Sequence, residues 1–151
     1  MGNCIKSLRE ERAKSVIING LHKQTNELPI YKLNGKFDCK VVDVYDGDTC
    51  TIVLHNKGDY EKHKLRMFGY DSPEIRPKKD IADRDEVIRN AHLAKDALKN
   101  LVMDKICVFD SMGYDKYGRL LGVLYIEHVN VNEKMLADGY GYVYTGGTKQ
   151  V

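Results

Sequence analysis

Apolar and polar residues follow a pattern along this chain that predicts a small β-rich domain. β-Branched and apolar residues predict strands over residues 37–44 and 49–54, with an Asp-Gly pair near their connection. A third strand follows the turn at residues 55–59 and ends near Gly69. Two more strands are predicted over residues 105–109 and 120–127.

The clearest helix covers residues 85–103, where apolar side chains recur at spacings of three and four residues. Residues 132–138 predict a short helix that ends at Gly139. Five short strands with a helix inserted after the third are typical of a Greek-key barrel of the OB type. We therefore predict an α+β fold that is mainly β, a five-stranded OB-fold barrel with two or three flanking helices.

Residues 1–36 form a predicted N-terminal extension, and residues 37–151 the barrel domain. Apolar positions from Ile5 to Leu21 suggest one weakly periodic helix in the extension. The extension holds seven Lys and Arg against three Glu, whereas the rest of the chain holds 17 basic against 19 acidic residues. The predicted domain is thus mildly acidic, so binding of a phosphate has to depend on a local group of basic residues.

The composition, 42% hydrophobic and 30% charged, is ordinary for a globular domain. The four cysteines show no CxxC spacing, the histidines show no metal-ligand spacing, and the N-terminus lacks the apolar segment of a secretory signal. We expect buried free thiols and an intracellular, cytoplasmic protein that is monomeric.

Three short runs carry candidate chemistry: 46–49 (Asp-Gly-Asp-Thr), 66–74 (Arg to Asp-Ser-Pro-Glu) and 115–119 (Asp-Lys-Tyr-Gly-Arg). They offer acidic oxygens for a hard cation and two arginines that can grip a phosphate. Each run alone also fits a structural role. Asp-Gly is a common hairpin turn, Ser72 before Pro73 could cap a helix, and a lone strand arginine usually lies on the surface.

The three runs resemble the three signature blocks of the staphylococcal nuclease (thermonuclease) family, in the same order, and the resemblance spans about residues 37–144. It implies an OB-fold endonuclease, typically calcium-dependent, that cuts DNA and RNA and leaves a 3′-phosphate and a 5′-hydroxyl. The family usually has threonine where Ser72 stands, which matters little if the ligand is the main-chain carbonyl.

The resemblance also implies roles for single residues. One Ca²⁺ ion, in preference to Mg²⁺, would be held by Asp48, Asp71 and the Ser72 carbonyl. Asp46 and Asp48 lie two residues apart, so along a strand both carboxylates would point to one face. Asp46 is expected to orient a water bound to the ion and not to bind the ion itself.

The catalytic residues expected from the same blocks are Glu74, Arg66 and Arg119. Glu74 would orient or deprotonate the attacking water, and the two arginines would stabilise the transition state. The sequence leaves open which of the two roles Glu74 has.

Candidate contacts to nucleic acid are Tyr117, Tyr142, Tyr144, Lys78 and Lys79. For the C-terminal tyrosines, packing in the domain is an equally good interpretation. Preference between DNA and RNA stays open. A catalytically inactive OB-fold module that binds nucleic acid or protein is the alternative function.

The chain starts with Met1-Gly2-Asn3-Cys4. Gly2 could carry a myristoyl chain and Cys4 a palmitoyl chain, and nearby basic residues could add attraction to a membrane surface. Against this, the usual motif has Ser or Thr at position 6, where this chain has Lys6. An ordinary cytosolic N-terminus is the alternative.

Overall fold

The computed structural model describes residues 2–27 and 30–144, and the chain splits into two compact units, Met1–Tyr31 and Lys32–Val151. The first unit contains helix α1 (Gly2–Leu21), which confirms the predicted N-terminal helix. Its described apolar side chains are exposed and spread around the helix instead of forming one stripe. Within the described residues, no helix is both long and apolar enough to cross a membrane.

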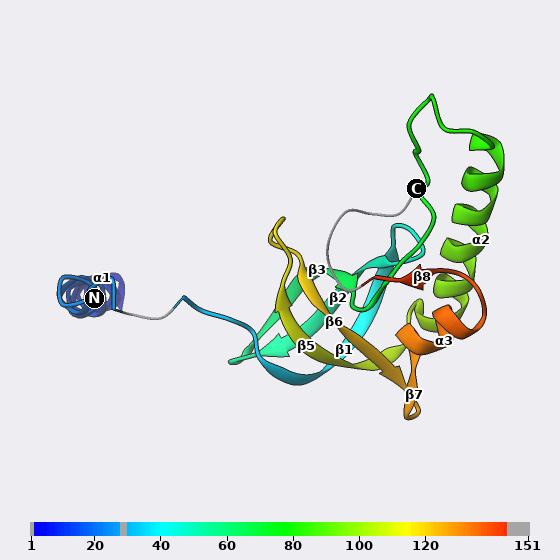
Figure 1. Cartoon of the computed structure of the whole chain (residues 1–151). Helices are drawn as coiled ribbons and strands as arrows, with labels where there is room; N and C mark the ends of the chain where they lie inside the picture. The colour runs from blue at the N-terminus through cyan, green and yellow to red at the C-terminus, as the bar shows by residue number, and fades with distance from the viewer. Residues whose placement is uncertain (1, 28–29, 145–151) are drawn as a thin grey trace. The chain divides into compact units, whose positions relative to one another are not determined.

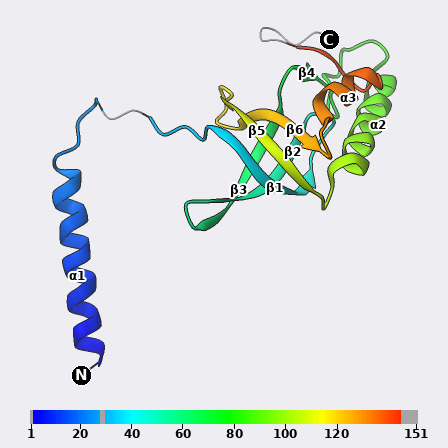
Figure 2. The ribbon, with the colours of Figure 1, turned by 90° about the horizontal axis from the view of Figure 1, so that it is seen from below.

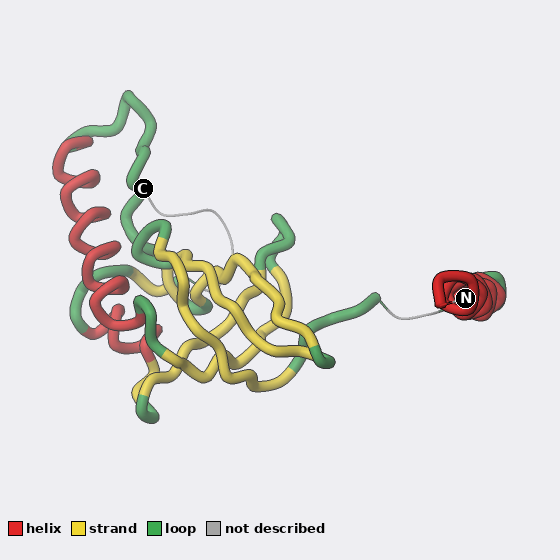
Figure 3. The backbone as a smooth tube through the Cα atoms, turned by 180° about the vertical axis from the view of Figure 1, so that it is seen from behind, coloured by secondary structure: helices red, strands yellow, loops and turns green. Residues whose placement is uncertain are grey.

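The second unit is built on a closed five-stranded barrel (Figures 1 and 3). Its strands are β1 (Gly35–Val44), β2 (Thr49–Asn56), β3 (Asp59–Met67), β5 (Ile106–Tyr114) and β6 (Leu120–Ile126). They pair in the order β3-β2-β1-β5-β6, and a parallel pairing of residues 65–67 with 120–122 joins β3 to β6 and closes the sheet. The predicted five-stranded barrel of the OB type is confirmed.

Two helices cover one end of this barrel, where Figures 1 and 2 show them side by side. They are α2 (Arg84–Val102) and α3 (Val131–Ala137), within one residue of the predicted ranges. Short strands complete the unit: β4 (Tyr70–Asp71) pairs with β8 (Tyr142–Val143), and β7 (Val129–Asn130) extends β6. The alternative of a helix starting at Ser72 is wrong, because a loop runs from there to Arg84.

The barrel interior is filled by alternate residues of the strands together with one face of α2. Among them are three free cysteines, Cys39, Cys50 and Cys107, as predicted for buried thiols. Burial raises the pKa of Cys39 to about 12 and that of Cys107 to about 11. These thiols therefore stay protonated and act as small apolar core groups.

One buried polar residue, Asn132 of α3, fixes the turn between β3 and β4. Its side-chain carbonyl accepts a hydrogen bond from the Leu124 N–H, and its amide donates to the carbonyls of Phe68 and Gly122. Leaving these buried backbone groups unpaired would cost free energy, so Asn132 holds the turn against β6. The turn carries residues of the site described next.

Candidate active site

The first part of the site is the connection between β1 and β2. Asp46, Gly47 and Asp48 form a bend there, and the Asp48 N–H donates to Asp46 Oδ1 at 3.0 Å. The expectation that both carboxylates share one face of a strand is wrong. The Asp-Gly turn is correct instead, because the side chain of Asp46 closes the bend by accepting a main-chain N–H.

Gly47 allows two other segments to approach this bend. A Cβ atom at Gly47 would lie 2.6 Å from the Cβ of Ala94 on α2 and 2.7 Å from the Cβ of Ser72. The buried Tyr70 hydroxyl donates to the Gly47 carbonyl at 2.7 Å. Glycine is therefore required here for close packing, which brings residues 70–72 against the acidic bend.

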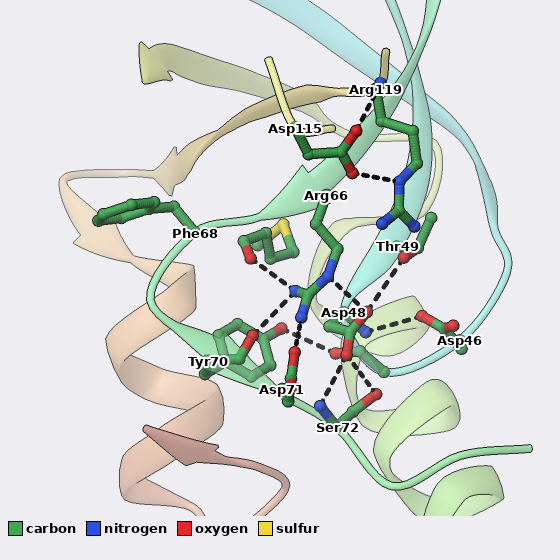
Figure 4. A network of polar contacts seen from close by, with 12 residues as sticks. Asp46, Asp48, Thr49, Arg66, Phe68, Tyr70, Asp71, Ser72, Asp115 and Arg119 are labelled. Atoms are coloured by element: carbon green, nitrogen blue, oxygen red, sulfur yellow. Dashed lines mark hydrogen bonds and ion pairs between the residues drawn. The ribbon is translucent and has the colours of Figure 1, made fainter. Parts of the chain in front are cut away.

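Asp48 is a buried carboxylate held by several hydrogen bonds. Its Oδ2 accepts hydrogen bonds from the Ser72 N–H at 2.7 Å and the Ser72 hydroxyl at 2.9 Å. Its Oδ1 accepts from the Thr49 hydroxyl at 3.0 Å (Figure 4). These three hydrogen bonds fix the orientation of the carboxylate, which can accept about four in all.

Arg66 lies at the end of β3 where the barrel closes, and its residue exposure is only 9%. The guanidinium donates to the carbonyls of Met67 at 2.7 Å and Tyr70 at 2.8 Å. It forms an ion pair with Asp71 and a second one with Asp48, with 3.3 Å between Arg66 Nε and Asp48 Oδ1. Two carboxylates from distant runs therefore converge on one cationic group (Figure 4).

Arg119 is oriented by the loop between β5 and β6. Its Nε donates to Asp115 Oδ2 at 2.6 Å, while Asp115 Oδ1 accepts the N–H groups of Tyr117 and Arg119. Burial would raise the pKa of Asp115, but these hydrogen bonds outweigh it and hold the pKa below its usual range. Asp115 is thus a charged anchor that fixes a partly exposed arginine.

These elements surround one cleft of about 950 Å³. The cleft brings together most of the residues singled out from the sequence: Asp46, Asp48, Arg66, Asp71, Glu74, Tyr117, Arg119 and Tyr144. Four others are not in its lining: Ser72, which is buried against Asp48, and Tyr142, Lys78 and Lys79. Sequence reasoning gave no role to Asp115, Lys116, Tyr45 and Phe68, which also line it.

The cleft carries more negative than positive charge. Five carboxylates line it against three cationic side chains: Asp46, Asp48, Asp71, Glu74 and Asp115 against Arg66, Lys116 and Arg119. Burial, followed by the negative charge of Asp48, raises the pKa of Asp46 to about 6. A polyanion would be repelled from such a cleft unless a cation offset the excess.

The donors present suit a hard cation that also uses main-chain and water oxygens. Within the described ranges, no three His, Cys, Asp or Glu side chains are grouped so that they could hold an ion by themselves. Asp48 and Asp71 nevertheless both reach one cationic group, Arg66. Calcium accepts six to eight oxygens from carboxylates, carbonyls and water, so two carboxylates that come close together fit its chemistry.

We predict that Asp46→Asn stabilises the metal-free protein at neutral pH and has no such effect in acid. A carboxyl with a raised pKa in the folded state favours folding below its unfolded pKa, and this contribution is lost as the pH rises through about 6. The asparagine variant should therefore gain about 1–3 kcal/mol in the free energy of unfolding at pH 7.5 and nothing below pH 4. Denaturant titrations at both pH values test this, and an equal gain at both would contradict it.

Comparison with known proteins identifies the family. The model of the staphylococcal nuclease homologue family matches residues 64–150. An uncharacterized protein of Methanocaldococcus jannaschii is 33% identical, covering 70% of this chain and 58% of its own length. An uncharacterized endonuclease of Haemophilus influenzae is 32% identical over 72% of this chain and 53% of its own length.

Endonuclease YncB of Bacillus subtilis is 30% identical, covering 70% of this chain and 49% of its own length. The chain thus spans about half the length of the curated relatives it matches. The match to the family model covers more than half of the chain and includes the runs that carry Arg66, Asp71, Glu74 and Arg119. This chain belongs to the staphylococcal nuclease homologue family.

Proposed function

We propose that this chain is a calcium-dependent endonuclease that hydrolyses phosphodiester bonds of DNA or RNA and leaves 3′-phosphate ends. The observation that carries this proposal is the convergence of Asp48 and Asp71 on Arg66, in a cleft that Glu74 and Arg119 also line. Family membership supports it, as does the word endonuclease in the names of the Haemophilus and Bacillus relatives.

Asp48, Asp71 and the Ser72 carbonyl would hold the calcium ion. When bound, the ion supplies positive charge that neutralises the scissile phosphate and offsets the excess of carboxylates in the cleft. Mg²⁺ suits the residues less well, because it demands a near-ideal octahedron and gives up its water reluctantly. Asp46 accepts a hydrogen bond from the Asp48 N–H and would orient a water bound to the ion.

Glu74 would act on the attacking water. Its residue is exposed, lines the cleft and lies two positions after Ser72, which supports this role. It would orient the attacking water, and a carboxylate can also accept the proton that this water loses. Neither task needs Glu74 to touch the ion. Its loss should therefore affect turnover more than binding of calcium.

Arg66 and Arg119 would both bind the scissile phosphate. A guanidinium presents a planar fork that matches two phosphate oxygens, and donors already aimed at the developing charge need little rearrangement in the transition state. Arg119 is held ready by Asp115, whereas Arg66 is held by main-chain carbonyls and both acidic residues. The alternative function, an inactive binding module of the same fold, would bind nucleic acid without hydrolysing it.

We expect Arg119→Ala to reduce the rate of DNA cleavage by about 100- to 1,000-fold, the usual effect of removing one transition-state donor. The melting temperature should change little, because the side chain is partly exposed. Arg89→Ala on the exposed face of α2 removes the same charge outside the cleft and serves as the matched control. Equal activity of the two variants would contradict the role of Arg119.

Calcium titration separates the proposed ligands from the water-orienting residue. Asp48→Asn and Asp71→Asn should each weaken calcium binding about tenfold or more, because each removes a formal charge from the ion. Glu74→Gln should bind calcium nearly as the wild type does while its cleavage rate falls. Isothermal calorimetry of the three variants gives the affinities, and equal affinity in all of them would mean that the ligand set is wrong.

The N-terminal acylation expected from the sequence is also proposed here. Residues 1–4 lie outside the part of the chain whose side chains the structure describes. The first described residues of α1 are exposed and include Lys6, Arg9 and Arg12, diluted by acidic neighbours. Because the apolar side chains of α1 form no single face, attachment to a membrane would depend on acyl chains at Gly2 and Cys4.

A myristate analogue supplied to cells should label the wild-type chain and not Gly2→Ala, and only the wild type should sediment with membranes. Cys4→Ser should keep the myristate label and lose most of the membrane fraction, because one acyl chain binds only marginally. An unlabelled, unsedimented wild type would exclude the anchor and leave the proposed nuclease unaffected.

A further inference from the structure

Exposed aromatic rings gather at the cleft more than elsewhere on the barrel unit. Among the described residues from Lys32 onward, the exposed tyrosines and phenylalanines are Tyr45, Tyr60, Phe68, Tyr114 and Tyr117. Three of these, Tyr45, Phe68 and Tyr117, line the cleft. Exposing a ring to water costs free energy, so a concentration of rings around a phosphate-binding site suggests a ligand with flat apolar faces.

Tyr117 differs from the other two rings because charged side chains already contact it. The Arg119 guanidinium lies 5.6 Å from its ring centroid, and the Lys116 ammonium lies 5.1 Å from it. This cation–π contact helps hold Arg119 in place. Among the described residues, the rings of Tyr45 and Phe68 have no such partner, although 58% of Tyr45 and 43% of Phe68 is exposed.

Both rings stand on turns that are fixed by backbone hydrogen bonds. The Tyr45 N–H donates to the Thr49 carbonyl at 2.9 Å, next to the acidic bend. The Phe68 N–H donates to the Gly122 carbonyl at 2.8 Å, and the Phe68 carbonyl accepts from the Asn132 amide. The backbone at each ring is therefore already positioned before any ligand arrives.

Both rings line the same cleft as Arg66. Phe68 follows Arg66 by two residues, and Figure 4 shows its ring to one side of Arg66. Tyr45 directly precedes the bend that carries Asp48, which forms an ion pair with Arg66. A phosphate held by Arg66 would therefore lie in a cleft that these two exposed aromatic rings also line. Each nucleotide carries a flat base beside a phosphate, so a cleft with both aromatic rings and arginines offers groups that suit a nucleic acid strand.

We infer that Tyr45 and Phe68 are stacking platforms for bases of the strand whose phosphate Arg66 binds. The inference rests on the proposed function and adds the residues that select the substrate's form. A base can stack on a protein ring only after it leaves its neighbours in the helix, so the two platforms favour unpaired strands. They read the flat face of a base and not its edges, so they discriminate little between base types.

The test measures binding of a fluorescent oligothymidylate of about ten nucleotides. The full-length protein carries Glu74→Gln to slow cleavage, and calcium is present. In this background, Tyr45→Ala and Phe68→Ala should each lower the affinity by about five- to 100-fold. Tyr45→Phe and Phe68→Tyr keep a ring and should restore binding. Tyr60→Ala removes a ring that is 82% exposed outside the cleft lining and should leave the affinity unchanged.

A strand of the same length without bases isolates stacking from phosphate binding. Both alanine variants should bind this abasic strand as tightly as their background does. Alanine variants that bind oligothymidylate like the background, or that lose equal affinity for the abasic strand, would overturn the platforms while the nuclease stands. A wild-type protein that neither cleaves nor binds either strand would overturn the proposed function and the platforms together.

Discussion

The buried guanidinium of Arg66 is the constraint on which the site depends. It lies where β3 meets β6 and closes the barrel, so its position is set by the strand pairing that defines the fold. A buried charge is tolerated only when paired, and removal of one partner of such a pair typically costs about 3–5 kcal/mol. Asp48 and Asp71 supply that pairing, with two main-chain carbonyls completing the shell.

This arrangement makes the chemistry of the cleft inseparable from the stability of the barrel end. The same carboxylates that neutralise Arg66 are those proposed to bind calcium, so a substitution of either one affects both the ion pairs at the barrel end and the proposed ion site. Arg119 is paired differently from Arg66, because the carboxylate that holds it, Asp115, lies in the same loop. A substitution at Arg119 should therefore report on catalysis, whereas one at Arg66 reports on folding as well.

The sequence predicted the barrel and both of its helices because their signals are local. Apolar and polar residues alternate along the strands, and apolar residues recur every three or four positions along α2. Both patterns show which residues face the core, and packing of the core determines the fold. The ion pairs of Asp48 and Asp71 with Arg66 are tertiary contacts that the sequence did not predict. The resemblance to a known family suggested only that the two carboxylates share one calcium ion. The packing of Gly47 against Ala94 and Ser72, which brings those parts together, has no sequence signal beyond a small residue in a turn.

Two kinds of error follow from the same limit. The spacing of Asp46 and Asp48 suggested a shared strand face, but the Asp46 side chain bonds to the main chain and bends it instead. Tyr45 and Phe68 were missed because an isolated aromatic residue beside a motif is indistinguishable from a core residue until its exposure is known. Aromatic residues that directly flank charged motifs are the pattern that could have drawn attention to them.

Cleavage of single-stranded DNA by the full chain, with calcium and with a chelator, tests the central claim most directly. Product should accumulate in calcium, stop when the ion is chelated and resume when calcium is restored, with phosphate at the 3′ ends of the fragments. Cleavage that continues at the same rate in the chelator, or no cleavage by a folded protein that binds calcium and DNA, would contradict it.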